Sequence, residues 1–241
     1  MNRIACCLVS LGFALPLTTN AQEFCNTTPI TVPGAGTAGP ANPYPATIVV
    51  TGGPASISSV VVSLYGASHT FSSDLDLLLV SPDGQRIVLQ SDVGGATDLS
   101  GTSYAISDSA GQPFTGAQIA SAYYRPTNVT GGDTFPAPAP PGPYAEPAPA
   151  ASATLAGTFN GTSADGIWGL YIADDAAGDV GSVSGGWCLR FSDPLLRISE
   201  FRLRGPNGAF DEFVELQNIG AAPITVDDIG SGSGFAIAAS D

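Results

Sequence analysis

The segment SDLDLLLVSPDG, residues 73–84, decides the fold class of this chain. Side chains alternate between the two faces of an extended strand, so Leu75, Leu77 and Leu79 share one face. The opposite face carries Asp74, Asp76, Leu78 and Val80. A Pro-Asp-Gly sequence follows, and it is typical of the tight turn of a hairpin. The segment therefore predicts a strand with a hydrophobic face that leads into a hairpin.

Segments of the same character lie on both sides of it. They are short, rich in Val, Ile and Leu, and bounded by Gly, Pro or Asp, as strands are. Expected strands cover residues 47–50, 57–65, 75–81, 86–91, 103–107, 154–159, 166–173 and 186–191. The 30 Gly and 20 Pro also favour short strands and turns over helices. The fold class expected is all-β, a jelly-roll or similar β-sandwich.

Two stretches interrupt this pattern. Residues 22–45 are rich in Thr, Pro, Gly and Ala, and we expect them to form an extended arm. Residues 135–151 contain seven prolines, which lack the amide proton that a sheet ladder needs. We expect this proline-rich loop to be exposed, polyproline-like and a spacer. The alternative is that it is a ligand for an aromatic-lined groove.

Residues 1–21 have the pattern of a secretory signal peptide. Arg3 precedes an apolar run over residues 4–17, and the small residue Ala21 marks the expected cleavage site. The run is shorter than the ~20 residues of a spanning helix, so no membrane span is expected there or later. The mature chain should begin at Gln22 and be secreted or extracellular, in a periplasm or at a cell surface.

The cysteines agree with an oxidising compartment. Cys6 and Cys7 leave with the signal peptide, so one pair remains in the mature chain. That pair predicts a disulfide between Cys25 and Cys188. Closing so long a loop stabilises the fold by ~4–5 kcal/mol in the chain-entropy model. Neither cysteine has the CxxC partner or nearby base that a redox or nucleophilic role requires.

The charge of the chain limits its partners. The whole sequence has a formal net charge of −14, with seven basic and 21 acidic residues and no lysine. Loss of Arg3 with the signal peptide leaves six basic residues against 21 acidic ones, a formal charge of −15. Nucleic acids and anionic membranes are therefore not expected to be partners of this chain.

Four blocks of sequence carry a family resemblance. Residues 73–84, 159–170, 173–183 and 186–189 resemble, in order and spacing, the P domain of subtilisin-like proprotein convertases, also called the P/Homo B domain. The resemblance covers residues 45–192. It implies an eight-stranded, galactose-binding-like jelly roll, which in convertases packs beside the catalytic domain and supports its folding, calcium dependence and pH response. The proline-rich loop departs from the convertase pattern, and no catalytic domain precedes these blocks. We expect the P-domain-like sandwich to span residues 22–193.

The remaining residues resemble a second family. Residues 196–201 and 211–218 are similar to the first two strands of a lamin-tail domain, an immunoglobulin-like sandwich. Fewer than ~50 residues rarely make an independent sandwich. Residues 194–241 are therefore expected to be an incomplete immunoglobulin-like β segment.

Acidic side chains gather at one end of the expected central strand. Asp74 and Asp76 project together, near a Gly-rich loop that brings Asp92 and Asp98. Clustered hard oxygen ligands suit Ca²⁺, which takes 6–8 of them. Asp74, Asp76 and Asp92 are the candidate Ca²⁺ ligands. The alternative is that they are solvated turn residues, because no EF-hand spacing is present.

Other conspicuous side chains are expected to be structural. Asp174, Asp175 and Asp179 form a second acidic turn, where carboxylates commonly accept hydrogen bonds from backbone amides. Trp168 and Trp187 lie within apolar strands, so we expect core positions for them rather than anchors for a carbohydrate or peptide.

No catalytic function is expected. Gly-Thr-Ser sequences at 101–103 and 161–163 echo the active sites of subtilisin-like peptidases, and His69 is the only histidine. A triad needs a base oriented by a carboxylate beside the nucleophile. No Asp-centred or His-centred subtilisin motif and no βαβ pattern is present. A serine endopeptidase label attached through the P domain would rest on association, because fold does not confer chemistry.

Two hypotheses of function follow. The first is a secreted, non-catalytic module for attachment or assembly outside the cell. The alternative is a P domain that supports a subtilisin-like peptidase supplied by a separate chain. Three Asn-X-Thr sequences could carry glycans in a host that glycosylates, at Asn26, Asn128 and Asn160.

Overall fold

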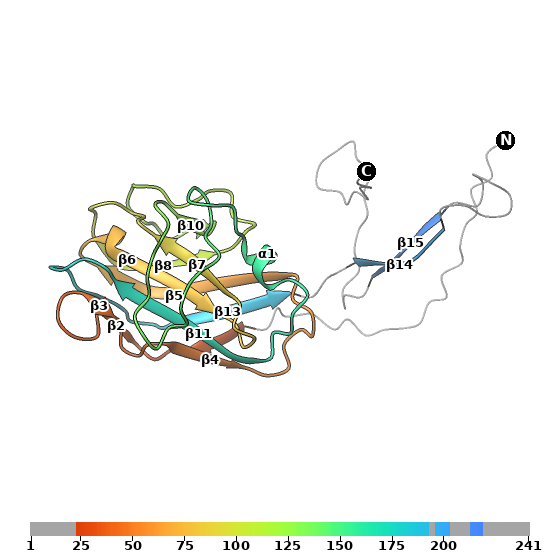
Figure 1. The fold of residues 1–241 in the computed structure, drawn as a ribbon, viewed down its shortest axis with the longest axis horizontal. Coiled ribbons are helices and arrows are strands. Elements are labelled where there is room, and N and C mark those ends of the chain that lie inside the picture. The colour runs from red at the N-terminus through yellow and green to blue at the C-terminus, as the bar shows by residue number, and fades with distance from the viewer. Residues whose placement is uncertain (1–22, 193–195, 203–212, 219–241) are drawn as a thin grey trace. The chain divides into compact units, whose positions relative to one another are not determined.

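The computed structural model describes residues 23–192, 196–202 and 213–218. Two compact units meet in the chain near Pro194. The first unit is a β-sandwich of two sheets, with one short α-helix beside them (Figure 1). The expected all-β sandwich is thereby confirmed. The jelly-roll type of strand connection stays a prediction.

The first sheet has seven strands centred on β5. Their order is β1-β13-β5 along one half of β5 and β2-β12-β5 along the other, and β8 and then β9 lie on the opposite side. The strands are β1 (Glu23–Asn26), β2 (Ile30–Val32), β5 (Ser59–His69), β8 (Leu99–Ile106), β9 (Tyr123–Tyr124), β12 (Gly181–Val183) and β13 (Trp187–Ser192).

The second sheet has six strands, and β6 and β11 are at its centre. Its order is β10-β7-β6-β11, after which β4 and β3 pair with successive parts of β11. The strands are β3 (Gly39–Pro40), β4 (Ala46–Val50), β6 (Leu75–Val80), β7 (Arg86–Ser91), β10 (Thr127–Asn128) and β11 (Gly166–Asp174). β6 and β7 form the expected hairpin: Gly84, with φ +81°, supplies the left-handed position of its turn.

The core lies between the two sheets. Leu75, Leu77 and Leu79 belong to one large cluster of buried side chains, as the alternation predicts. Trp168 and Trp187 belong to the same cluster and have no exposed surface, so their expected core positions are confirmed. Hydrophobic burial between two apolar sheet faces is the main stabilising contribution in such a fold.

One expected strand is a helix. Residues 154–159 were expected to be extended, but α1 (Leu155–Phe159) is helical. Thr154 caps it, because its Oγ1 accepts a hydrogen bond from the Gly157 amide. The Asp108 carboxylate, distant in sequence, accepts the first two amides, from Leu155 and Ala156. The long-range contact from Asp108 explains why local sequence did not predict the helix.

The N-terminal arm and the proline-rich loop are more ordered than expected. The arm contains β1, β2 and β3, each paired with a later strand. The loop covers the outer face of the second sheet, where the Phe135 ring is buried against Leu78 and Val88. The Ala145 amide donates to the Arg86 carbonyl, so a non-proline residue within the loop does join the ladder. The prediction of an exposed spacer is therefore wrong for this part of the loop.

The expected disulfide is present. Cys25 on β1 lies directly opposite Cys188 on β13, with the Cα atoms 4.1 Å apart. The bond ties the start of the sandwich to its last strand. Its pairing explains why the arm is ordered at this point.

The second unit contains a two-stranded antiparallel sheet, β14 (Leu196–Arg202) and β15 (Phe213–Asn218). Both strands were expected from the lamin-tail resemblance. The expected signal peptide at 1–21 lies outside the described residues, as does most of the segment 194–241. In the described part of the chain, no helix has the length and hydrophobicity to cross a bilayer.

Candidate functional site

Four strand ends of the second sheet meet at one place. β6 is antiparallel to both β7 and β11, and β10 is parallel to β7. The start of β6 therefore lies beside the ends of β7, β10 and β11. Asp76 is opposite Ala173, one residue before Asp174. The two acidic turns that the sequence analysis treated separately are consequently neighbours in space.

An acidic cluster forms at this edge. We use this name for Asp74, Asp76, Asp92, Asp133 and Asp175. All three candidate ligands from the sequence are members, together with two carboxylates that were not predicted to join them. The Asp175 amide donates to the Asp74 carbonyl, 3.1 Å away, which fixes the end of β11 against the start of β6. Asp74 ends a short 3₁₀ helix, η1 (Ser72–Asp74).

Asp76 is the buried member of the acidic cluster, with 4% of its surface exposed. Removal from water raises the pKa of Asp76 to about 8, because burial penalises the ionised form. The nearby Ser91 hydroxyl opposes the rise, whereas the charges of Asp133, Asp175 and Asp92 add to it. The three neighbouring charges that raise the pKa of Asp76 all belong to carboxylates.

Two other members show the same direction of shift. Burial raises the pKa of Asp74, and the neighbouring charge of Asp174 adds to the rise. Burial also raises the pKa of Asp175, with contributions from Asp74 and Asp92. Carboxylates gathered in this way disfavour their own ionised state, and the charge of His69 and a hydrogen bond from Ser73 oppose this at Asp74. A bound cation would reverse that preference.

Asp133 enters the acidic cluster through the loop after β10. Its carboxylate accepts hydrogen bonds from the Ser91 hydroxyl at 2.7 Å and the Asn128 amide group at 2.6 Å. Sequence reasoning missed it because Asp133 lies about 40 residues beyond Ser91, in Gly-rich sequence without a strand pattern. The only local signal is the pair Gly131-Gly132 before it, which allows a tight turn.

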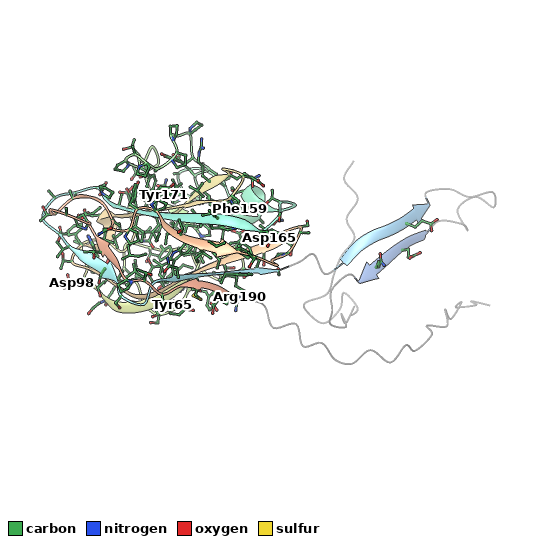
Figure 2. All side chains as sticks on the ribbon, turned by 90° about the horizontal axis from the view of Figure 1, so that it is seen from below. Tyr65, Asp98, Phe159, Asp165, Tyr171 and Arg190 are labelled. Atoms are coloured by element: carbon green, nitrogen blue, oxygen red, sulfur yellow. A yellow bond between two sulfur atoms is a disulfide. The ribbon has the colours of Figure 1, made fainter. Side chains whose placement is uncertain are left out.

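Asp92 and Asp98 have different surroundings. Asp92 follows β7 with a left-handed φ of +57°, a conformation that Asp tolerates better than most residues. Asp98 is exposed and precedes β8, at the end of the sandwich opposite that of Asp165 (Figure 2). Asp92 is among the main charges that raise the pKa of Asp76, and Asp98 is not.

A buried pair of side chains, His69 and Asp174, borders the acidic cluster. His69 Nε2 lies 3.2 Å from the Asp174 carboxylate, with neither side chain exposed. His69 Nδ1 lies 2.7 Å from the Phe71 carbonyl oxygen and 3.3 Å from the Phe71 amide nitrogen. Asp174 also accepts the Ala176 amide, which confirms the expected backbone bond of this turn. The pairing of Asp174 with His69 was not predicted.

The pair corrects one part of the catalytic argument. The sequence analysis found no carboxylate to orient His69, but Asp174 does so. Both ring nitrogens are then occupied, and the residue is only 1% exposed. Ser103 accepts the Gly66 amide, and Ser163 accepts the Asp165 amide. Within residues 23–192, neither serine hydroxyl is hydrogen bonded to His69.

The donor set can be compared with the needs of a metal ion. Among the described residues, the one trio of ligand atoms within 4.8 Å of one another is Glu23, Cys25 and Cys188, and both sulfurs are in the disulfide. The carboxylates of the acidic cluster are more widely spaced. Ca²⁺ accepts water, carbonyl and amide oxygens as well as carboxylates at 2.3–2.6 Å, so the oxygen-rich, uncompensated cluster fits its chemistry.

Two of the three glycosylation sequences are constrained by the fold. Asn128 has no exposed surface, and its side chain is held by Asp133 and by the Gly131 amide. Asn26 is half-buried and donates to the Thr47 carbonyl. Asn160 is exposed directly after α1. It is the most accessible of the three in the folded chain.

No protein-family model matches the sequence, and no curated protein matches it.

Proposed function

We propose that this chain is a secreted, non-catalytic β-sandwich module for attachment or assembly outside the cell, stabilised by Ca²⁺ at the acidic cluster. The observation that carries the proposal is the position of Asp76. Its carboxylate is buried, and the neighbouring charges of Asp133, Asp175 and Asp92 each raise its pKa. A divalent cation supplies the compensation that the protein lacks there.

Three features support the non-catalytic part. His69 is buried, both of its ring nitrogens are engaged, and the hydroxyls of Ser103 and Ser163 accept backbone amides elsewhere. Peptide hydrolysis by a serine requires the base and the nucleophile to be within hydrogen-bond reach. The purified chain should therefore not hydrolyse casein, with or without Ca²⁺. Hydrolysis that disappears in both Ser103→Ala and His69→Ala would contradict the proposal.

The alternative function is support of a subtilisin-like peptidase supplied by a separate chain. It rests on the P-domain resemblance of residues 73–84, 159–170, 173–183 and 186–189. A supporting domain should raise the yield of the folded peptidase when the two chains are co-expressed. An attachment module should leave the yield unchanged.

Thermal unfolding tests the Ca²⁺ proposal. A ligand at a hundredfold excess over its Kd stabilises the folded state by ~2.7 kcal/mol. For a domain of this size, that corresponds to a rise in Tm of about 5–10 °C. Asp76→Asn should abolish the rise. Asp83→Asn is the matched control, because Asp83 is an exposed acid in the β6–β7 turn and should leave the rise intact. An unchanged Tm in millimolar Ca²⁺ would contradict a Ca²⁺ site at the acidic cluster.

A further inference from the structure

A cleft separate from the acidic cluster lies beside α1. It has a volume of about 560 Å³ and is formed by the segment around Pro113 to Val129 and by the end of the proline-rich loop. We propose that this cleft binds an aliphatic chain that ends in a carboxylate. The residues that carry the argument are Phe114, Arg125, Val129, Pro149 and Ala153, which line it together.

The walls of the cleft are apolar and rigid. The Phe114 ring is buried, stacks on Tyr124 with centroids 4.2 Å apart, and meets Tyr104 edge to face. Pro149 adds a ring with a fixed backbone angle, and Val129 leaves 44% of its surface exposed. Ligand sites are commonly apolar clefts of ~300–1,000 Å³ with few polar groups. This cleft has the corresponding size and lining.

Most polar groups of the lining are already occupied. The two Asp108 oxygens accept the amides of Leu155 and Ala156. Thr127 Oγ1 accepts the Phe114 amide and donates to the Arg125 carbonyl.

The third polar side chain is Thr154, whose hydroxyl oxygen accepts the Gly157 amide at the start of α1. These three groups therefore have little capacity left for a ligand, whereas the exposed Ser152 hydroxyl of the lining is one uncharged group that could still bond to it. The body of a ligand would meet a surface that is in effect hydrocarbon.

Arg125 is the exception. Its side chain is exposed at the cleft, and within the described residues it has no carboxylate within 4.0 Å and no side-chain hydrogen bond. It is one of six basic residues in a mature chain with 21 acidic ones. A cation left unpaired in such a protein, at the rim of an apolar cleft, complements a single negative charge. Guanidinium groups match the planar, two-oxygen geometry of a carboxylate.

The proposal makes a quantitative statement about chain length. Each buried CH₂ contributes a roughly constant free energy, so affinity should rise about fourfold per carbon and about 14-fold per two carbons. The rise should continue from hexanoate to octanoate to decanoate, because the cleft volume exceeds that of these chains. Octanol should bind more weakly than octanoate, and raised salt should narrow that difference.

The experiment is a titration of the uniformly ¹⁵N-labelled chain with hexanoate, octanoate, decanoate and octanol, all below micelle-forming concentrations. The amide shifts should change around Phe114, Val129 and Ala153. Arg125→Gln should remove the preference for octanoate over octanol. Arg190→Gln is the charge-matched control, because Arg190 lies on β13 and is not among the residues that line the cleft. It should bind octanoate as the native chain does.

Other results would overturn the proposal. Absence of shift changes at the cleft, or equal affinity for octanol and octanoate, would contradict an anionic aliphatic ligand. Affinity unchanged by Val129→Asp, in a variant whose spectrum shows a folded chain, would place binding elsewhere. Tighter binding of an acetylated Ala-Leu-Val peptide with a free C-terminus, relative to octanoate and to its own amide, would assign the cleft to peptide C-termini instead.

Discussion

The imidazole of His69 and the carboxylate of Asp174 lie 3.2 Å apart, and neither side chain is exposed to solvent. The contact joins the end of β5 in the first sheet to the end of β11 in the second. It therefore connects the two layers of the sandwich at the edge that holds the acidic cluster. A buried polar pair of this kind is costly to break from one side, because the remaining group keeps its desolvation penalty.

Asp174→Ala should destabilise the chain by about 3–5 kcal/mol in urea unfolding, since it leaves the buried His69 Nε2 and the Ala176 amide without their hydrogen-bond partner. Asp174→Asn should cost less, because an amide can still accept from Ala176 and donate to a neutral imidazole. Asp175→Ala is the control at the neighbouring, exposed position. If Asp174→Ala lowers the free energy of unfolding no more than Asp175→Ala does, the contact between His69 and Asp174 contributes nothing to stability.

Removing the disulfide should lower the stability without changing the fold. Cys25 and Cys188 are 163 residues apart, so the chain-entropy model assigns the bond about 5 kcal/mol, acting through the unfolded state. The double variant Cys25→Ser, Cys188→Ser should therefore unfold at lower urea concentration with an unchanged far-ultraviolet circular dichroism spectrum. Loss of sheet signal in the absence of urea would show that the bond is required to form the sandwich.

Phe135 should anchor the proline-rich loop. Its ring is buried on the outer face of the second sheet and meets Tyr144 edge to face, with centroids 5.3 Å apart. Figure 2 shows that Tyr171, from this outer cluster, and Tyr65, on the first sheet, lie on opposite faces of the sandwich.

Phe135→Ala should cost about 3–5 kcal/mol and expose the loop to limited proteolysis, whereas Pro141→Ala, at an exposed position, should do neither. Equal cleavage rates in the native chain and the two variants would restore the expectation of a free spacer.

The metal-free chain should lose stability as the pH rises. The pKa of Asp76 is about 8 in the folded chain, against ~3.9 for an unperturbed Asp. Between these values the folded chain holds a proton that the unfolded chain has lost. The proton on Asp76 therefore makes its full contribution to the free energy of unfolding below pH ~4, and this contribution is lost as the pH approaches 8. The change is on the order of several kcal/mol.

In excess chelator, urea unfolding midpoints should fall from pH 5 to pH 8, and Asp76→Asn should flatten that profile. The raised pKa values of Asp74, Asp174 and Asp175 act in the same direction. A native profile that rises over this range would contradict the burial of an uncompensated Asp76.

Much of the fold could be predicted from local sequence. The alternation of Leu75, Leu77 and Leu79 predicted which face enters the core, because a strand has a fixed two-residue period. The turn before Gly84 and the pairing of Cys25 with Cys188 were likewise predictable from residue type. Helix α1 could not be predicted from local sequence, because the Asp108 carboxylate that holds its first amides lies 47 residues earlier.

The candidate site could be predicted only in part, for a related reason. Asp74, Asp76 and Asp92 flank strands that adjoin in sequence, so their proximity follows from one hairpin. Asp133 and Asp175 join them only because β10 pairs with β7 and β11 pairs with β6, and single-sequence patterns do not reveal such long-range pairing. Local patterns also gave no indication that Asp174 would meet His69.

The most direct test of the central claim is a calorimetric titration of the folded chain with Ca²⁺ at pH 7, in two buffers of different ionisation enthalpy. We predict saturable binding of one ion that releases protons, because Ca²⁺ displaces the proton that Asp76 retains at this pH. Binding should be lost in Asp76→Asn and kept in Asp83→Asn. Absence of binding heat in the native chain, or binding that survives Asp76→Asn, would contradict a Ca²⁺ site at the acidic cluster.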